Sequence, residues 1–583
     1  MNQSSDINGA GVTTLDGLFR WRVALTPQAV AYHQFDSADN TWRAWRWVEV
    51  AEEVERWRSA FEQHSLEPGE RVAVMTGNCV EWVVFDQAAF AAGLVTVPLF
   101  SEDNAQNCEH ILCDAGVRVV VVGGARQLEK IKSVLGDIPS VEQIVCITDL
   151  ASQDKSERVT DLRDWLTHAD TAAGVPSAAT QGRDDLATIV YTSGTTGTPK
   201  GVMLTHANIL KNAQASGQVA DIGAGDTLVS FLPLSHMFER TAGYYLTMLA
   251  GAEVAFARSV TTLVDDIAKF RPTALISVPR IYEQVFNKLE AKLRRSPAGY
   301  VLFKAAVAVG SRRERNPLCK ALWPVFDHAV ARRIRAIFGG RMRYAISGGA
   351  AMPPDITRAL LALGVPVCQG YGLTETSPVL SVNLPDDNVP ESIGRPIPGV
   401  EVKIGDDDEL LTRGDYVMQG YWHLPDATHA AIDNDGWFHT GDKGRIDEDG
   451  RLYIIGRIKE IIVMANGEKV PPADMEHALL ADPLISQVMV YGEGRPFLIA
   501  CVSPDPEQMQ THENTGSAAA SLLRRSKKLL AQFPAYARVR RFVFVEEPFS
   551  IANGMLTPTL KMKRTVIAAQ HSGQIEEAYR GIK

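Results

Sequence analysis

Residues 189–206, with the sequence IVYTSGTTGTPKGVMLTH, combine the residue types that bind a phosphate group. An apolar run leads into a loop of glycines and small hydroxyl residues that ends at Lys200. Glycines let several backbone N–H groups turn toward one anion, and a lysine adds a positive charge. The hydroxyl residues are Thr192, Ser193, Thr195 and Thr196, and the first two glycines are Gly194 and Gly197. The pattern therefore predicts a loop that wraps phosphate oxygens.

This loop differs from the P-loop, in which the lysine directly follows glycine and precedes serine or threonine. Here Lys200 follows Pro199 and precedes Gly201. A flexible surface loop is the simplest alternative for a run of small polar residues. The length of the run, directly behind an apolar strand, favours a binding function.

Further motifs follow the loop toward the C-terminus. They are SGGA (347–350), YGLTET (371–376), GWFHTGD (436–442), GRIKEIIVMANGEKV (456–470) and a final segment with Lys561. In this order and spacing, over most of the chain, the sequence resembles the adenylate-forming acyl- and aryl-CoA synthetases. Within that family, PLSHMFERTAGYY (233–245) and NGMLTPTLKMKR (553–564) are most similar to long-chain fatty acyl-CoA synthetases.

The resemblance implies a reaction in two steps. The carboxylate of a fatty acid would attack the α-phosphate of ATP to give acyl-AMP and pyrophosphate, and the thiol of coenzyme A would then displace AMP. Such chemistry needs a metal and cationic donors to neutralise charge. We therefore expect ATP, Mg²⁺ and coenzyme A as cofactors or co-substrates. A carrier protein as acyl acceptor, an aryl or short-chain acid as substrate, and a silent binding protein of the same fold are the alternatives.

The resemblance also implies which residues hold the phosphates. Glu375 and Thr192 would bind Mg²⁺, because oxygen ligands suit this hard cation. Thr374 would bond the α-phosphate, and Lys200 would supply a positive charge from the phosphate loop. Lys561 resembles the lysine that contacts the carboxylate and the α-phosphate during adenylation. Thr-Pro-Thr-Leu precedes it where the more widespread form has Ser-Gly, so Lys563 is the alternative.

A second group of residues is expected around the nucleoside. It comprises Gly349, Ala350, Tyr371, Gly372, Asp442 and Arg457. Tyr371 would offer a flat face to adenine, and the small residues before it would admit the purine edge. The carboxylate of Asp442 can accept two hydroxyl hydrogen bonds from ribose, with Arg457 beside it. Each residue alone has an ordinary structural alternative, and the motifs together favour the site.

Two further positions are expected to take part in domain movement and in substrate binding. Because Lys561 lies in a distant domain, the site would be assembled by domain closure. Lys459 is at the hinge position of the family, where a few residues absorb large backbone changes. His236 is at the position that lines the acyl or coenzyme A tunnel.

Hydrophobic periodicity predicts the elements that position these motifs. Val50, Val54, Trp57 and Phe61 recur at helical spacing. Four apolar runs, 72–75, 95–99, 117–122 and 144–147, follow with room for one helix between each pair. This alternation predicts an α/β fold with a largely parallel sheet. A polar segment, 151–185, predicts a loop-rich connection to a second α/β unit.

Beyond about residue 460 the hydrophobic pattern changes to short helical and strand-like segments, which predict a small α+β unit. We therefore expect an α/β protein with two domains. Residues 1–457 would form a large N-terminal adenylation domain of several subdomains. Residues 458–583 would form a small mobile α+β domain, with the hinge near Lys459.

Composition narrows the class of protein. The 583 residues include 59 Lys and Arg against 69 Asp and Glu, and the net charge of −10 gives no general attraction to nucleic acid. The seven cysteines form no Cys-x-x-Cys pair. No apolar run approaches the length of about 18 residues that a membrane span needs. We expect a cytoplasmic enzyme with no nucleic acid partner, and the oligomeric state stays open.

One segment departs from the acidic average. Residues 281–343 contain 14 Lys and Arg but four Asp and Glu. Apolar residues are interleaved with these cations: Tyr300, Val301, Leu302, Phe303, Trp323, Val325 and Phe326. A basic face with apolar neighbours can dock on anionic headgroups. We predict reversible association with the inner face of an anionic membrane, and solvated helix faces over core residues are the alternative.

Overall fold

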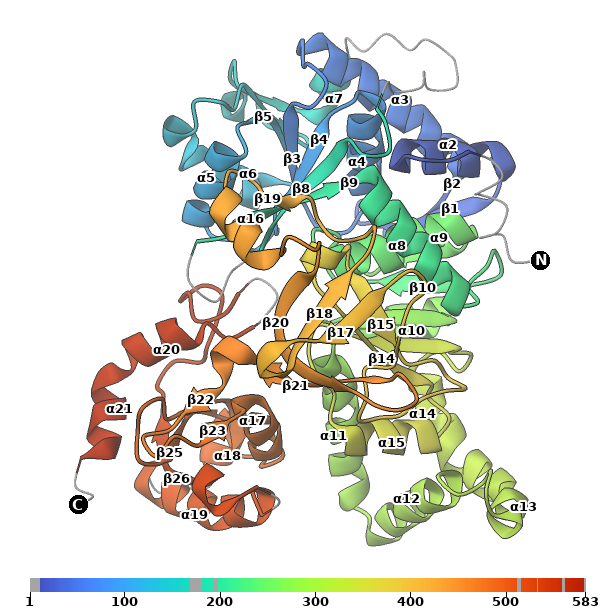
Figure 1. Ribbon diagram of the computed structural model, residues 1–583. Coiled ribbons are helices and arrows are strands. Elements are labelled where there is room, and N and C mark those ends of the chain that lie inside the picture. The colour runs from blue at the N-terminus through green and yellow to red at the C-terminus, as the bar shows by residue number, and fades with distance from the viewer. Residues whose placement is uncertain are drawn as a thin grey trace.

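The structure is a computed structural model. It describes residues 11–167, 181–192, 198–510, 515–531, 533–557 and 561–580. Figure 1 shows a large body built from the first three-quarters of the chain and a smaller body, coloured orange to red, beside its lower part. Sheets form the interior of the large body, with helices on their faces.

The first sheet of the large body contains the predicted alternation of strands and helices. Its order is β19-β9-β8-β4-β3-β5-β6-β7. The strands are β3 (Arg71–Met75), β4 (Val95–Pro98), β5 (Val117–Val122), β6 (Gln143–Cys146), β7 (Val159–Asp161), β8 (Leu186–Thr192), β9 (Lys200–Thr205) and β19 (Gly420–Tyr421). The central strands are parallel, and β8 and β9 form an antiparallel pair. The predicted α/β fold is confirmed.

Helices cover the faces of this sheet and bury their apolar side chains against it. They are α2 (Leu15–Leu25), α3 (Trp47–Gln63), α4 (Val80–Ala91), α5 (Ala105–Asp114) and α6 (Ala125–Lys132). Helix α3 buries Val50, Val54, Trp57 and Phe61 on one face. Helix α4 is buried along its length, as its nearly continuous apolar sequence requires.

The second sheet carries two of the predicted motifs. Its order is β16-β15-β14-β13-β12-β10-β11-β1-β2. The strands are β1 (Val30–Asp36), β2 (Thr41–Arg46), β10 (Thr227–Ser230), β11 (Glu253–Phe256), β12 (Ala274–Ser277), β13 (Tyr344–Ser347), β14 (Val367–Gly372), β15 (Val379–Val382) and β16 (Arg395–Pro396). The SGGA and YGLTET motifs lie at the carboxyl ends of the parallel neighbours β13 and β14. Ligands bind at such ends in open α/β sheets.

Further helices pack around the second sheet. They are α8 (His206–Val219), α9 (Leu246–Ala250), α10 (Leu263–Phe270), α11 (Pro279–Arg294), α12 (Pro297–Gly310), α13 (Pro317–Phe326), α14 (Arg332–Ile337) and α15 (Pro354–Ala362). Side chains of α8 share one hydrophobic core with strands of both sheets, among them Ile209 with Val190 and Leu228. The two sheets are therefore parts of one packed unit.

An antiparallel third sheet carries the GWFHTGD motif. Its strands are β17 (Glu401–Ile404), β18 (Glu409–Arg413), β20 (Phe438–Ile446) and β21 (Leu452–Arg457), with α16 (Pro425–Ala431) nearby. The register of β20 and β21 puts Asp442 opposite Arg457. Two residues that lie 15 positions apart in the sequence thus become neighbours.

The smaller body is an α+β unit, as predicted. It contains β22 (Ile462–Val463), β23 (Lys469–Val470), α17 (Pro472–Leu480), β24 (Ile485–Tyr491), β25 (Leu498–Pro504), α18 (Pro506–Met509), α19 (Thr515–Leu529), β26 (Val539–Phe544), α20 (Arg564–Gln570) and α21 (Ser572–Tyr579). One hydrophobic cluster lies on each face of the β24-β25-β26 sheet. Each face is therefore covered by its own core.

The prediction of a loop-rich connection over 151–185 is partly wrong. Strand β7 adds to the edge of the first sheet, and α7 (Leu162–Leu166) follows it. Trp165 packs edge-on against Trp57 at 5.5 Å and against Phe61 at 5.2 Å between ring centroids. Aromatic packing against α3 thus orders a segment whose local composition is polar. Residues 168–180 of the predicted connection lie outside the described residues.

Candidate active site

The predicted phosphate loop joins two paired strands. Strand β8 ends at Thr192 and β9 begins at Lys200, and the two residues are register partners. The hairpin therefore holds both ends of the loop in place. The predicted phosphate contacts of Ser193, Gly194, Thr195, Thr196 and Gly197 lie outside the described residues.

Tyr421 connects the lysine of this loop to Glu375. The Lys200 ammonium lies 4.9 Å from the centre of the Tyr421 ring, a cation–π contact. The Tyr421 hydroxyl donates to Glu375 Oε1 at 3.0 Å. Burial and the Glu375 carboxylate raise the pKa of Tyr421, so this hydroxyl stays a donor. Strand β19 brings Tyr421 here by pairing with β9, a long-range contact for which the sequence has no local signal.

Helix α8 holds the turn that carries Glu375. The side-chain amide of Asn212 donates to the Thr376 and Val379 carbonyls at 3.1 and 2.8 Å, and its oxygen accepts from the Val379 N–H at 3.1 Å. Thr241 donates to the Ser377 carbonyl at 2.9 Å. These bonds satisfy a buried turn and fix its position against the core.

Three predicted nucleoside residues form one polar group around the buried Asp442. The Tyr371 hydroxyl donates to Asp442 Oδ2 at 2.6 Å, and Arg457 Nε lies 3.1 Å from Asp442 Oδ1. Burial raises the pKa of Asp442, and the Arg457 guanidinium opposes that rise. Burial and the Asp442 carboxylate raise the pKa of Tyr371. A carboxylate has about four acceptor positions, so two partners leave room for two hydroxyl donors.

Gly349 and Ala350 follow β13, the strand that pairs with β14, which carries Tyr371. Gly349 has a φ of +81° and is exposed together with Ala350, which leaves this edge open. A side chain would not fit at Gly372, because a Cβ there would lie 1.9 Å from the Pro378 carbonyl oxygen. Thr374 is half-buried in the turn just before Glu375.

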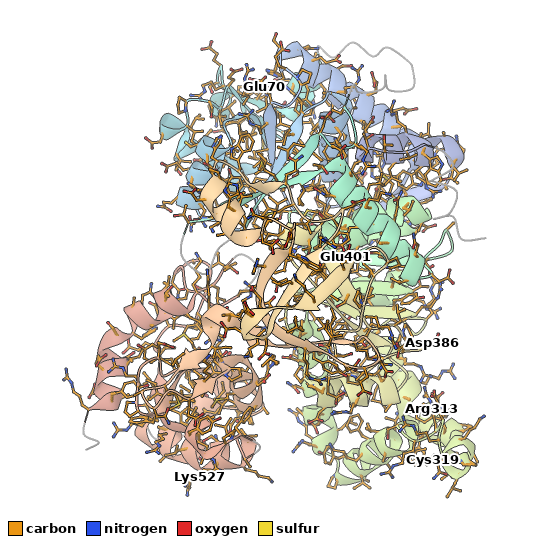
Figure 2. The ribbon with its side chains drawn as sticks, in the orientation of Figure 1. Glu70, Arg313, Cys319, Asp386, Glu401 and Lys527 are labelled. Atoms are coloured by element: carbon orange, nitrogen blue, oxygen red, sulfur yellow. The ribbon has the colours of Figure 1, made fainter. Side chains whose placement is uncertain are left out.

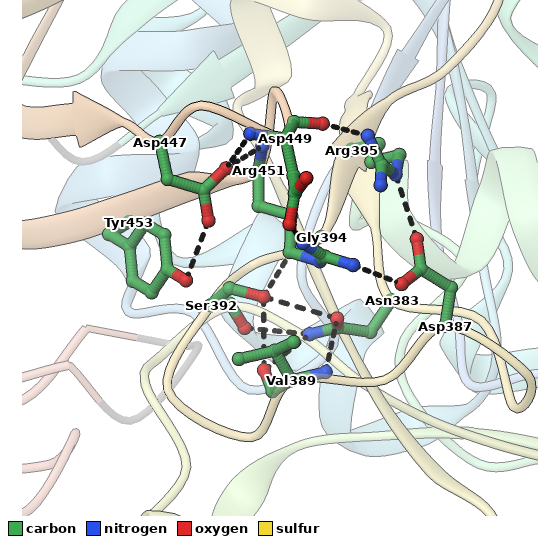
Figure 3. A network of polar contacts seen from close by, with 10 residues as sticks. All are labelled: Asn383, Asp387, Val389, Ser392, Gly394, Arg395, Asp447, Asp449, Arg451 and Tyr453. Atoms are coloured by element: carbon green, nitrogen blue, oxygen red, sulfur yellow. Dashed lines mark hydrogen bonds and ion pairs between the residues drawn. The ribbon is translucent and has the colours of Figure 1, made fainter.

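A polar network anchors the β20–β21 hairpin that carries Asp442 and Arg457 (Figure 3). Arg395 Nε lies 2.7 Å from Asp387 Oδ2, and Arg451 pairs with the other oxygen of this carboxylate. The network thereby joins the turn of the hairpin to the loop between β15 and β16, and it ties the third sheet to the second.

Lys561 reaches this group from the smaller body. Burial of its ammonium group and the Arg457 charge lower the pKa of Lys561, and the charges of Asp442, Glu375 and Glu460 oppose that lowering. The residue as a whole is exposed. The Lys561 N–H donates to Thr557 Oγ1 at 3.0 Å.

The other lysines of the prediction lie elsewhere. Burial raises the pKa of Asp103, and the positive charge of Lys563 opposes that rise in part. Lys459 is exposed in the short 3-10 turn Ile458–Glu460, directly after β21. Next to it, Glu460 lies 3.5 Å from Arg564 of α20. The turn therefore stands where the chain passes from one body to the other.

His236 lies near Lys561. Burial lowers the pKa of His236 to about 4, and the charge of Lys561 contributes to the lowering. The imidazole is therefore neutral at pH 7, and its Nδ1 accepts the Phe238 N–H at 3.2 Å. The Phe238 ring packs against Gly348, where a Cβ would lie 2.9 Å from the ring. The PLSHMF segment thus adjoins the SGGA turn.

Sequence reasoning missed a buried ion pair behind the phosphate loop. Arg240, in the π-helix Glu239–Tyr245, pairs with Asp86 of α4, and both side chains are fully buried. Arg240 also donates to Thr96 of β4 at 2.8 Å and to Thr188 of β8 at 2.9 Å. The cluster ties the strand before the loop to the PLSHMFER segment. The charged residues Glu239 and Arg240 inside the largely apolar run 237–250 are a signal of it in the sequence.

Comparisons with known proteins agree with this geometry. The AMP-binding enzyme family matches residues 19–422, and the AMP-binding enzyme C-terminal domain matches residues 459–583. The long-chain-fatty-acid–CoA ligase FadD15 of Mycobacterium bovis is 33% identical over 577 residues, which are 95% of each chain. Long chain acyl-CoA synthetase 7, peroxisomal, of Arabidopsis thaliana is 32% identical over 93% of this chain and 83% of its own.

A solved structure has the same fold. The adenylation domain of the carboxylate reductase from Mycobacterium chelonae gives a TM-score of 0.82 at 23% identity, over 99% of this chain and 93% of that one. The order of motifs, the sheets that carry them and the two family matches agree. The chain therefore belongs to the AMP-binding enzyme family, as the resemblance predicts.

Proposed function

We propose that the protein is an ATP-dependent long-chain fatty acid–CoA ligase that acts through an acyl-AMP intermediate. The observation that carries the proposal is the hydrogen-bonded and ion-paired group of Tyr371, Asp442 and Arg457 on β14, β20 and β21, on which the charge of Lys561 from the smaller body also acts. Relatives named as long-chain ligases, at 32–33% identity over nearly the whole chain, support the choice of substrate.

The residues suggest how ATP would be held. Adenine would lie at Tyr371 beside Gly349 and Ala350, and the ribose hydroxyls would donate to Asp442, which Arg457 and Tyr371 already orient. The β8–β9 loop and Lys200 would bind the β- and γ-phosphates. Burial of Asp442 strengthens its polar contacts.

Glu375 and Thr192 fit a magnesium site. Among the residues that the structure describes, no cluster of three or more His, Cys, Asp or Glu side chains could hold a metal. Mg²⁺ is commonly held by one or two carboxylates together with substrate phosphates, which agrees with the donors available here. Bound there, the ion would neutralise charge on the phosphates.

The first step would join the fatty acid to AMP. A carboxylate oxygen attacks the α-phosphorus, a new P–O bond forms, and the bond to pyrophosphate breaks. The Lys561 ammonium would hold the carboxylate and the α-phosphate together and stabilise the charge that develops. In the second step the thiol of coenzyme A attacks the acyl carbonyl, the proton leaves the sulfur, and AMP departs.

We further propose that residues 1–457 and 458–583 change orientation between the two steps. Lys561 has to leave the carbonyl before a thiol can approach it, and the exposed turn at Lys459 is the point where the backbone can rotate. The enzyme would work in the cytoplasm and associate reversibly with the inner face of the membrane, because a long-chain acid partitions into lipid and residues 281–343 are basic.

Half-reactions separate this proposal from its rivals. With palmitate and no coenzyme A, we expect acid-dependent exchange of pyrophosphate into ATP. Addition of free coenzyme A should give AMP release and palmitoyl-CoA in equal amounts. Exchange without any acyl-CoA would point to a carrier protein as acceptor, a maximum with benzoate to an aryl acid ligase, and no exchange with any acid would contradict the proposal.

A further inference from the structure

The helical hairpin α12–α13 (residues 297–326) exposes several large apolar side chains. It forms the lowest part of the large body in Figure 1, and Arg313 and Cys319 are labelled on it in Figure 2. The exposed fractions are 67% for Val301, 39% for Leu302, 66% for Leu318, 42% for Leu322 and 65% for Val325. In the part of the chain that the structure describes, no helix is long and apolar enough to cross a bilayer.

The apolar residues of α13 form a stripe along the helix. Leu318, Ala321, Leu322 and Val325 recur at the spacing i, i+3, i+4 and i+7, and all four are exposed. In a globular protein this spacing marks the face that packs on the core. Here the opposite side, with Cys319, Trp323 and Phe326, is half-buried instead. The stripe is therefore a second apolar face of α13 that nothing among the described residues covers.

The hairpin is firmly attached despite this exposure. Phe303 and Ala306 of α12 belong to a core cluster with Tyr282 of α11. A Cβ at Gly310 would lie 2.1 Å from the Ala362 carbonyl oxygen, so α12 packs closely on the end of α15. The prediction that Phe303 contributes to an apolar surface is therefore wrong, because this ring is 1% exposed. A rigid base presents α13 to the outside.

The same hairpin carries cations without acidic partners. Residues 297–326 contain five Lys and Arg and one Glu, in a chain of net charge −10. Lys304 lies 3.6 Å from Glu290. Among the described residues, none of the other four forms an ion pair; they are Arg312, Arg313, Arg315 and Lys320. Arg313 lies over the Trp323 ring at 4.8 Å, and the rest are exposed. These charges can bind external anions.

We propose that the α12–α13 hairpin docks the enzyme on anionic lipid bilayers. Leu318, Leu322 and Val325 enter the boundary between headgroups and acyl chains, and Arg312, Arg315 and Lys320 bind the lipid phosphates. A symmetric contact between two copies through this surface would bring the same unpaired cations together, which disfavours it. The proposal rests on the proposed function, because a long-chain acid dissolves in the bilayer that the hairpin contacts.

Vesicle flotation tests the docking without any catalysis. The purified full chain is mixed with vesicles of pure phosphatidylcholine or of phosphatidylcholine with 30% phosphatidylglycerol, at low and high salt. We expect at least tenfold tighter binding to the anionic vesicles at low salt. Arg312→Glu, Arg315→Glu and Lys320→Glu together should abolish that preference. Leu318→Ser, Leu322→Ser and Val325→Ser together should lower binding at least fivefold.

Matched variants control for net charge and for surface apolarity. Arg524→Glu, Lys527→Glu and Lys528→Glu change the net charge equally on exposed positions of α19, and Val260→Ser with Val264→Ser removes exposed apolar side chains elsewhere. Both should bind like the wild type. Pyrophosphate exchange with octanoate should be unchanged in all variants, so a failure of the proposed function is seen separately.

Three outcomes would overturn the docking proposal. Equal binding to neutral and anionic vesicles would remove the role of the cations. Equal loss in the α19 control would mean that net charge alone is responsible. A dimer in sedimentation that the Leu318, Leu322 and Val325 changes dissolve would assign the stripe to a second copy of the chain.

Discussion

Individual side chains of the site support one another across different elements. Glu375 accepts a hydrogen bond from Tyr421, and the Tyr421 ring also lies against the Lys200 ammonium. Tyr371 and Arg457 hold the two oxygens of Asp442 in the same way. Side chains that are oriented before the substrate arrives lower the cost of reaching the reactive geometry.

The Glu375–Tyr421 pair gives a prediction about magnesium. Glu375→Gln removes the charge and keeps the shape, so adenylation should fall at least about a hundredfold. Tyr421→Phe removes only the supporting hydrogen bond and should raise the Mg²⁺ concentration for half-maximal rate about tenfold. Titration of Mg²⁺ in the exchange assay measures both. Unchanged Mg²⁺ dependence in Glu375→Gln would refute the metal assignment.

The pKa of Lys561 gives a prediction about pH. Burial and the Arg457 charge lower this pKa, and the proposed role of Lys561 in adenylation requires the charged ammonium form. The rate should therefore fall as pH rises through a value below that of a free lysine. Arg457→Gln removes a positive charge, so the pKa of Lys561 and the alkaline limb should move to higher pH.

This shift is measured in kcat for exchange at saturating ATP. Arg445→Gln is the control, because Arg445 is an exposed arginine of the same hairpin. It should leave the alkaline limb in place. A limb that stays fixed, or moves to lower pH, in Arg457→Gln would show that Lys561 is not the titrating group.

At the scale of elements, strands that are distant in sequence converge on the site. The β8–β9 hairpin, the ends of β13 and β14, and the β20–β21 hairpin each supply part of it. The buried Asp86–Arg240 pair fixes β4 and β8 against the π-helix behind the loop. A buried pair stabilises only while both charges are present.

Replacement of one residue of the Asp86–Arg240 pair should therefore destabilise the fold more than replacement of both. Arg240→Met leaves the buried Asp86 without compensation and should destabilise the fold by about 3–5 kcal/mol. The double variant with Asp86→Leu should recover most of that loss. The midpoint of urea unfolding measures the effect, with Asp355→Asn in the exposed Asp355–Arg358 pair as a control that changes little. A double variant as unstable as Arg240→Met would contradict this account.

Much of the fold could be predicted from the sequence because its signals are local. Apolar runs such as Val117–Val122 give buried parallel strands, and the Val50 to Phe61 spacing gives a helix face. Strand β7 and helix α7 escaped prediction because Trp165 is ordered by Trp57 and Phe61 of α3. Tyr421 and Arg240 escaped for the same reason, since tertiary contacts decide their roles.

At the scale of the whole molecule, charged groups of the two bodies act on one another near the site. The charges of Asp442 and Glu375 act on Lys561, and the charge of Lys563 acts on Asp103. On another face, burial raises the pKa of Glu283 of α11, and His477 of α17 opposes the rise. Under the proposed function this arrangement would serve the adenylation step, and the two bodies would change orientation for the thioester step.

A hinge at Lys459 would permit that change. Lys459→Pro fixes φ and removes an N–H donor, so one arrangement should become inaccessible. We expect acyl-AMP formation from ATP and palmitate to continue and conversion to palmitoyl-CoA to fall at least about a hundredfold, as a blocked conformational step requires. Lys459→Ala is the control and should keep both steps. Full palmitoyl-CoA synthesis by Lys459→Pro would put the pivot elsewhere.

The separate half-reactions of Lys561→Ala test the central claim most directly. The claim is that a lysine from the smaller body completes the site for adenylation alone. Acyl-AMP formation from palmitate and ATP should fall at least about a hundredfold, because one charge-stabilising donor is lost. Thioester formation from synthetic palmitoyl-AMP and coenzyme A should stay within a fewfold of wild type, and Lys563→Ala should keep both reactions. Equal loss of the two half-reactions in Lys561→Ala, or loss of adenylation in Lys563→Ala alone, would contradict the account.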